Sequence, residues 1–345
     1  MKKSIIYLFV CAISGMMLTT SCQDSLDLDA TNSNTRNVTI DKDLFAVKGR
    51  INVKLAKGTN YAIPSSPNGD VEMQSVPSAM ASAMKFSGAY RMERVFKPAG
   101  IYEARTVAEG LDRWYTIYFD ESKDVSAVLQ QFNKVNGIEY AERVLPIANP
   151  KFTAKPYTGS TPQTRNQPTA SAFNDPLLGK QWHYYNDGSI SPRAKKGADC
   201  NLKPVWEKYT TGKSNVIVAI VDGGIDVTHE DLVDNLYINE KEKNGQAGVD
   251  DDGNGFVDDV YGYNFVEAKD VVGGKIEPDN EGHGTHVAGT VAARNNNGKG
   301  VAGVAGGNGA ADSGVRLMSC QIFRGKDEQG DAAAALKYAA ANAPV

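Results

Sequence analysis

The residues best suited to carry chemistry lie in two short segments in the second half of the 345-residue chain. In the first, an apolar run rich in β-branched residues, 216–221, ends at Asp222, which two glycines follow. Such a run is typical of a strand buried on both faces, as in a parallel sheet. A carboxylate at the carboxyl end of a parallel strand lies at the edge where open α/β sheets bind their ligands. Taken alone, the segment predicts either a site carboxylate or an aspartate that begins a turn.

The second segment centres on His283, one of four histidines in the chain, with Gly282 and Gly284 on either side of it. The glycines allow a tight turn into a helix that starts near His283, and the small residues that follow allow this helix to pack closely on a sheet. His286 lies three residues further on, on the same helical face, but the glutamate of an H-E-x-x-H zinc site is absent. His286 fits a histidine of the core, whereas His283, in a glycine-flanked first turn, does not.

Together the two segments resemble the aspartate and histidine signatures of the subtilisin family of serine peptidases. The matching residues are A-I-V-D-G-G-I-D at 219–226 and G-H-G-T-H-V-A-G at 282–289, in the family order of Asp before His. The resemblance implies that His283 is the general base that takes the proton of the serine, and that Asp222 holds its imidazole in one tautomer. It extends over residues 173–345, which resemble the first half of a subtilisin-like domain. The implied substrates are proteins or peptides.

The first half of the chain predicts a small α+β domain. Ile51, Val53 and Leu55 alternate with polar residues as in a half-buried strand, and a helical period over 125–135 follows Asp124, a suitable N-cap. The predicted order of strand, helix, strand, strand, helix, strand is the ferredoxin-like pattern. Because many subtilisins carry a prodomain of this pattern before the catalytic domain, the resemblance implies an inhibitory prodomain of the fervidolysin-like type. An unrelated binding domain is the alternative.

The N-terminus indicates export. Lys2 and Lys3 precede an apolar stretch, 5–18, that is too short to span a bilayer comfortably. Small residues then lead to Cys22 in a pattern that resembles the lipobox of bacterial lipoproteins, and the acidic tether after it resembles the export signals of surface lipoproteins. We therefore predict lipidation at Cys22 and an anchored position in the bacterial outer membrane, at the cell surface or the periplasmic face. A plain signal peptide with a chance cysteine is the alternative.

The net charge of −4 gives no indication of nucleic-acid binding, so the predicted partners are substrates, the prodomain, and a membrane through the lipid anchor only. The predicted fold class is α/β, with a ferredoxin-like α+β prodomain followed by the first half of a subtilisin-like parallel-sheet α/β domain.

Cys200 and Cys320 either form a disulfide in an oxidising compartment or remain free thiols. The predicted parts of the chain are a lipoprotein signal peptide (1–21), a flexible tether (22–47), a ferredoxin-like inhibitory prodomain (48–148), a linker (149–172) and a partial subtilisin-like catalytic domain (173–345).

No serine downstream of His283 suits the role of nucleophile. The family's serine lies in a G-T-S-M-A segment downstream of the histidine, and neither that segment nor the asparagine of the oxyanion hole is present. Ser313 lies in a polar loop and Ser319 lies in an apolar strand, so neither has the strand-to-helix turn that a nucleophile needs. We expect this sequence to be the N-terminal portion of a serine endopeptidase, because its parallel sheet would otherwise keep an unpaired buried edge. By itself, this portion should be inactive and unprocessed. The alternative is a truncated, catalytically inactive, lipid-anchored binding or inhibitory module.

An acidic loop predicts a calcium site. Asp250, Asp252, Asn254 and Asp258 place oxygen ligands at the alternating positions of an EF-hand loop, with a glycine at the sharp turn. Tyr261 replaces the bidentate glutamate at the twelfth position, which makes a complete helix–loop–helix unit doubtful. A calcium-stabilised insertion is the prediction, and a solvated acidic loop is the alternative.

A second structural calcium site is implied by the resemblance to calcium-binding subtilisins. Asp175, Asp231 and Asn296 fall at the side-chain ligand positions of that family, and backbone carbonyls of residues 294–301 would complete the shell.

Overall fold

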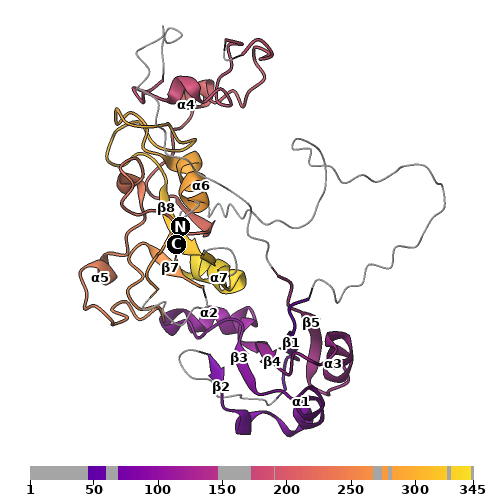
Figure 1. Ribbon diagram of the computed structural model, residues 1–345. Coiled ribbons are helices and arrows are strands. Elements are labelled where there is room, and N and C mark those ends of the chain that lie inside the picture. The colour runs from indigo at the N-terminus through magenta and orange to yellow at the C-terminus, as the bar shows by residue number, and fades with distance from the viewer. Residues whose placement is uncertain are drawn as a thin grey trace, which may run out of the picture.

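In the computed structural model, two folded regions follow one another along the chain, and their elements are labelled in Figure 1. The predicted signal peptide, the predicted lipidation site Cys22, and nearly all of the predicted tether and linker lie outside the described residues. The structure describes residues 46–59, 69–146, 172–189, 191–266, 274–278, 282–324 and 328–342.

Five antiparallel strands form the sheet of the N-terminal region, in the order β2-β3-β4-β1-β5. Without the short edge strand β2, this order is that of the ferredoxin-like fold, which confirms the predicted fold of the first half. The strands are β1 (Arg50–Leu55), β2 (Asp70–Val71), β3 (Arg91–Arg94), β4 (Trp114–Tyr118) and β5 (Ile138–Arg143). The helices are α1 (Ala81–Ser87), α2 (Glu103–Ala108) and α3 (Val125–Phe132), with 3-10 turns η2 (Met73–Ser75), η3 (Ser78–Met80), η4 (Gly100–Tyr102) and η5 (Leu111–Arg113).

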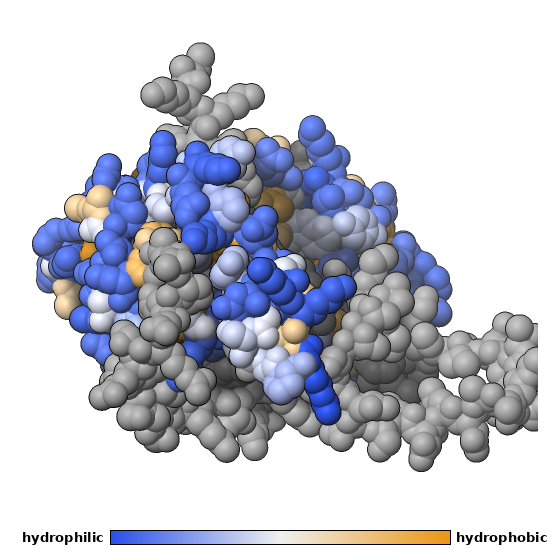
Figure 2. Space-filling view, turned by 90° about the horizontal axis from the view of Figure 1, so that it is seen from above, coloured by the Kyte–Doolittle hydropathy of each residue, from blue (hydrophilic) through white to orange (hydrophobic). Residues whose placement is uncertain are grey.

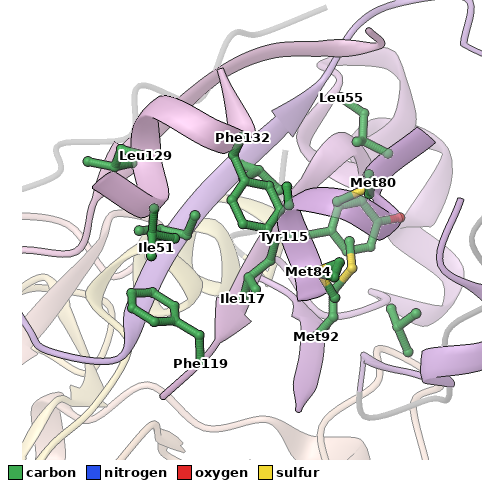
Figure 3. Close-up of a cluster of buried hydrophobic side chains, with 14 of the residues drawn as sticks. Ile51, Leu55, Met80, Met84, Met92, Tyr115, Ile117, Phe119, Leu129 and Phe132 are labelled. Atoms are coloured by element: carbon green, nitrogen blue, oxygen red, sulfur yellow. The ribbon is translucent and has the colours of Figure 1, made fainter. Parts of the chain in front are cut away.

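One face of this sheet carries the hydrophobic core. Ile51, Val53 and Leu55 are buried on it, as their alternation predicts, and Phe132 of α3 packs against them (Figure 3). Asp124 caps α3 by accepting a hydrogen bond of 2.6 Å from the backbone of the helix, which satisfies a donor that the first turn leaves without a partner. The periodicity of β1 and α3 therefore predicts which of their side chains enter the core.

The second region is built on a parallel sheet in the order β6-β8-β7. Its strands are β6 (Ile217–Asp222), β7 (Gly262–Asn264) and β8 (Arg316–Gln321), and a small hairpin pairs β9 (Phe323–Arg324) with β10 (Glu328–Gln329). The helices are α4 (Lys203–Lys208), α5 (Glu240–Lys243), α6 (His283–Ala292) and α7 (Ala332–Asn342), with 3-10 turns η6 (Leu178–Lys180) and η7 (Val233–Asn235).

Both faces of the parallel sheet are covered, which confirms that β6 is buried on both sides. On one face, Val218 and Ile220 pack with Ala288 of α6. On the other, Ala219 packs in a cluster with Met318 and with Tyr338 of α7. Each fully buried aliphatic side chain of this kind contributes about 1.5–3 kcal/mol relative to an exposed one. The two helices therefore hold β6, and the carboxylate at its end, in a fixed place.

The face drawn in Figure 2 is mainly hydrophilic over the described residues. No helix in that part of the chain is both long and apolar enough to cross a membrane. Cys200 is an exposed free thiol and Cys320 a buried one, and burial raises the pKa of the Cys320 thiol.

Candidate active site

The carboxylate of Asp222 and the imidazole of His283 meet at one edge of the parallel sheet. Asp222 is the last residue of β6, and His283 is the first residue of α6. His283 Nδ1 lies 2.7 Å from Oδ1 and 2.9 Å from Oδ2 of Asp222. Because an ionised carboxylate only accepts hydrogen bonds, Nδ1 carries the proton and Nε2 holds the basic lone pair of the ring. The geometry thus suits a carboxylate that orients an imidazole base.

Asp222 is held on both its side chain and its backbone. The Gly223 amide donates a hydrogen bond of 2.6 Å to Asp222 Oδ1, and the Ile322 amide donates one of 2.8 Å to the Asp222 carbonyl. The residue is buried, whereas the His283 side chain keeps 20% of its surface exposed. The carboxylate is therefore shielded from water while the imidazole remains open on one side.

The start of α6 lies unusually close to the turn that follows β6. A Cβ atom at Gly284 would lie only 2.3 Å from the Gly224 carbonyl oxygen, and Gly224 itself has a φ of +88°. The Asp226 amide donates a hydrogen bond of 2.9 Å to Thr285 Oγ1. These glycines are required because any side chain at Gly284 would force the helix, and His283 with it, away from Asp222.

His286 does not belong to the core. It is exposed on α6, because the helix turns Gly284, Ala288 and Ala292 toward the sheet and His286 to the opposite side. The prediction that His286 is a buried histidine is therefore wrong.

The hydroxyl groups of Ser313 and Ser319 both have backbone partners. Ser313 Oγ donates to the Ala310 carbonyl at 2.7 Å and accepts from the Asn308 amide at 3.0 Å. Ser319 is fully buried in β8, and its Oγ accepts from the Ile225 amide at 3.2 Å. Their roles in this structure are those of turn and strand residues.

Three carboxylates gather where α5 meets the acidic loop, residues 250–259. One oxygen from each of Glu242, Asp250 and Asp252 lies within 4.8 Å of the others. Asp250 and Asp252 belong to the alternating pattern of the loop, but Glu242 precedes it and the pattern does not include it. An acidic residue in the short helix directly before such a loop is the signal that could have identified it. Hard oxygen ligands of this kind suit calcium.

The other two predicted loop ligands have different surroundings. Asn254 is fully buried, and its side-chain amide donates to Asp259 and to Asn342 at 2.9 Å each. The Asp258 carboxylate accepts from the Gly248 amide at 2.9 Å and lies outside the group of three. The structure therefore brings Asp250 and Asp252 together with Glu242, and it places Asn254 beside them, because its side-chain amide donates a hydrogen bond of 3.3 Å to Asp252, whereas Asp258 lies outside this group.

The electrostatics of the three carboxylates fit a bound cation. Burial raises the pKa of Glu242, and the nearby charge of Asp252 adds to the shift. No salt bridge among the described residues links Glu242, Asp250 or Asp252 to a lysine or arginine. Like charges at this spacing disfavour the ionised forms unless an opposite charge lies between them, and a divalent cation would supply it.

The second set of predicted ligands lies around the loop that follows α6. The Asp175 carboxylate is fully buried and accepts from the backbone amide of Asn296 at 2.8 Å, and Asp231 accepts from the Val301 amide at 2.9 Å. The side chain of Asn297, which the sequence did not single out, donates to Asp231 at 2.8 Å, whereas that of Asn296 donates to a backbone carbonyl at 3.2 Å. Burial raises the pKa of Asp175, and the charge of Asp231 adds to the shift. Two carboxylates thus face one loop.

A buried polar network around Asp259 ties the acidic loop to α7. Asp259 is fully buried and accepts hydrogen bonds from Tyr338 at 2.6 Å, and from Asn254 and Asn239 at 2.9 Å each. Burial raises the pKa of Asp259 to about 7, against the hydrogen bonds from Tyr338 and Asn254, which lower it. Buried carboxylates persist where donors satisfy them in this way.

Comparison with known proteins places this geometry in a family. Residues 213–335 match the family model described as "Subtilase family", and residues 51–188 match the model "N-terminal of Subtilase family". The chain belongs to the subtilase family. The first match covers the aspartate–histidine pair, and the second covers the ferredoxin-like domain, so the resemblance stated from the two short segments is confirmed at the level of the family.

Similar curated proteins include three peptidases. "Subtilisin-like protease 1" of Plasmodium berghei (strain Anka) is 33% identical over 192 residues, which cover 55% of this subtilase chain and 28% of that protein. The protein of the same name from Plasmodium falciparum (isolate 3D7) is 49% identical over 106 residues, covering 31% and 14%. "Extracellular basic protease" of Dichelobacter nodosus is 37% identical over 145 residues, covering 39% and 21%. The chain therefore spans less than a third of the length of each of these relatives.

A solved structure described as proteases from the bacterium Pseudoalteromonas arctica is 32% identical to this chain. The alignment covers 49% of this chain and 43% of that one, with a TM-score of 0.30. A score this low supports no statement about the fold.

Proposed function

We propose that this subtilase acts as a serine endopeptidase in which Asp222 and His283 supply two of the three catalytic groups. The observation that carries the proposal is the contact of 2.7 Å between His283 Nδ1 and Asp222. With Nδ1 occupied by Asp222, Nε2 takes the proton of the serine hydroxyl as its oxygen attacks the peptide carbonyl. The same nitrogen then returns the proton to the leaving amine, and the buried carboxylate stabilises the imidazolium between these steps.

The proposal requires a serine from outside these 345 residues, since the serines that follow His283 have backbone partners. Residues 23–345 alone should therefore not hydrolyse peptides and should keep the N-terminal domain attached. Mass spectrometry of the purified protein and a generic peptide-hydrolysis assay test this. Hydrolysis that a serine-directed inhibitor blocks would show that a nucleophile lies within these residues.

The complete reading frame provides the positive test. If it supplies a G-T-S-M-A segment, its product should cleave itself within 149–172, and His283→Ala should abolish the cleavage. In subtilisin, a relative of this protein, loss of the histidine lowers kcat by about 10⁶-fold. His286→Ala is the matched control, because His286 is exposed on the same helix, and it should keep activity. An active His283→Ala variant would refute the assignment, and a reading frame without such a serine would favour the anchored binding or inhibitory module.

The N-terminal domain is proposed to inhibit the peptidase until it is cleaved off. The match of residues 51–188 to the N-terminal region of subtilases supports this. Adding the uncleaved His283→Ala protein to the active enzyme would not test this inhibition, because the N-terminal domain of the variant stays tethered to its own second domain. The comparison to make is peptidase activity before and after cleavage within 149–172, and equal activity would refute inhibition.

Calcium is proposed as a structural ion at two places. Glu242, Asp250 and Asp252 would hold one ion, and Asp175 and Asp231 would contribute to another. A bound ion would offset the repulsion within each group and add stability by mass action. Excess calcium should raise the melting temperature and EDTA should lower it, and an unchanged melting temperature would count against both sites.

Export and anchoring through an acylated Cys22 are proposed from the N-terminal sequence alone. A Cys22→Ala variant should move from the detergent phase to the aqueous phase in a phase-partition experiment. Unchanged partitioning of the variant would rule out the lipid on this cysteine.

A further inference from the structure

The N-terminal domain contacts the second domain at the acidic loop, outside the aspartate–histidine pair. The Ile101 amide donates a hydrogen bond of 2.8 Å to the Gly253 carbonyl oxygen. From the other side, Lys337 of α7 donates one of 2.6 Å to the Lys97 carbonyl. In Figure 1, α2 lies between the N-terminal sheet and α7. The connection between β3 and β4 thus serves as a docking segment, residues 97–102.

The contact is close enough to require glycine on both sides. A Cβ atom at Gly100 would lie 2.0 Å from the Gly253 carbonyl oxygen, and one at Gly255 would lie 2.8 Å from the Pro98 carbonyl oxygen. Gly100 has a φ of +49° and Gly255 one of +94°. Two backbones therefore meet without intervening side chains, so the contact depends directly on the conformation of the loop backbone.

One peptide unit joins this contact to the carboxylate cluster. The carbonyl of Gly253 faces the docking segment. The amide of the same peptide, that of Asn254, donates to Asp250 Oδ1 at 3.1 Å and to Asp252 Oδ1 at 3.0 Å. Because a peptide unit is planar, the direction of its N–H group sets the direction of its C=O group. A ligand that fixes the carboxylates of Asp250 and Asp252 therefore also fixes the Gly253 carbonyl, which accepts the hydrogen bond from the Ile101 amide.

We propose that a cation bound by Glu242, Asp250 and Asp252 and the docking of residues 97–102 stabilise each other. The proposal rests on the calcium site of the proposed function. Without a cation, three carboxylates within 4.8 Å repel one another and the Gly253–Asn254 peptide loses its fixed orientation. With a cation, the peptide is held and the N-terminal domain docks more tightly. The reverse effect has the same size, because coupling between two binding equilibria is reciprocal. Retention of the N-terminal domain therefore depends on divalent cation.

Calorimetric titration of residues 23–345 with calcium chloride tests the coupling. The loop site is identified as the binding event that Glu242→Gln removes. Gly100→Ala places a methyl group against the Gly253 carbonyl and changes no carboxylate. Gly58→Ala is the matched control, since Gly58 also has a positive φ, +82°, but its added Cβ would meet nothing within 4 Å. Gly100→Ala should weaken calcium binding at the loop site by about 5-fold or more, the lower end of typical couplings, and Gly58→Ala should not.

Hydrogen exchange supplies a second measurement that does not depend on peptidase activity. Calcium should slow exchange of the amides in residues 97–102 in the wild type but not in Glu242→Gln, while exchange in β1 and β4 shows that the domain stays folded. Equal calcium affinity in the wild type and Gly100→Ala, with unchanged exchange at 97–102, would overturn the coupling and leave the calcium site standing. Absence of calcium binding at the loop would overturn both the site and the coupling.

Discussion

Two glycines of the same helix should respond oppositely to the same substitution. At Gly284, a Cβ atom would lie 2.3 Å from the Gly224 carbonyl oxygen, whereas at Gly289 it would meet nothing within 4 Å. Real Cβ contacts are essentially never shorter than 3.0 Å, so in Gly284→Ala the helix or the turn must move by several tenths of an ångström. Overpacking of this kind costs about 1–3 kcal/mol. Gly289→Ala should instead stabilise the helix by about 0.5–1 kcal/mol.

The measurement is equilibrium urea unfolding of the two variants and the wild type. The free energies of unfolding are compared with the same dependence on urea concentration for all three proteins. The two variants should differ by about 1.5–4 kcal/mol, which follows from the two effects above. Gly284→Ala should also weaken the His283–Asp222 hydrogen bond, visible as a shift of the Nδ1 proton resonance, because His283 precedes the displaced residue. Equal stability of the two variants would refute the close approach of α6 to the turn at Gly224.

Two further predictions concern α7. Tyr338→Phe removes a donor from the buried Asp259 carboxylate and should lower the free energy of unfolding by about 1.5–3 kcal/mol. The control, Tyr209→Phe at an 80% exposed position, should change the free energy of unfolding little. Equal effects of the two substitutions in urea unfolding would contradict the buried network around Asp259. Burial lowers the pKa of Lys337 from 10.5 to about 8, with Glu103 opposing and Arg94 adding to the shift. The folded state then binds fewer protons than the unfolded state between these values, so stability should rise as the pH increases from about 8 to 10.5, and Lys337→Met should remove this dependence in unfolding measurements across that range.

The elements that local pattern specifies could be predicted from the sequence. The apolar run before Asp222 forms β6, and the helical period that follows Asp124 forms α3. Elements without a period of their own were missed, as β2 and β7 show, because two or three residues carry no alternation and pair only through their neighbours. The error at His286 has a related cause, since its helical face depends on how Gly284 seats the helix on the turn.

The acidic loop shows why a site cannot be fully derived from spacing. Its pattern identified Asp250 and Asp252, but the third carboxylate, Glu242, comes from the helix before it. The side-chain amide of Asn254, which the same pattern offers as a ligand, donates both to Asp252 within the loop and to Asn342, 88 residues away. Gly253 has a φ of +73°, which favours glycine in the turn, and its carbonyl accepts the hydrogen bond from Ile101 of the N-terminal domain. Because one short loop contacts a candidate ion site, the buried Asp259 network and a second domain, substitutions within it share partners, and their effects on stability should not be additive.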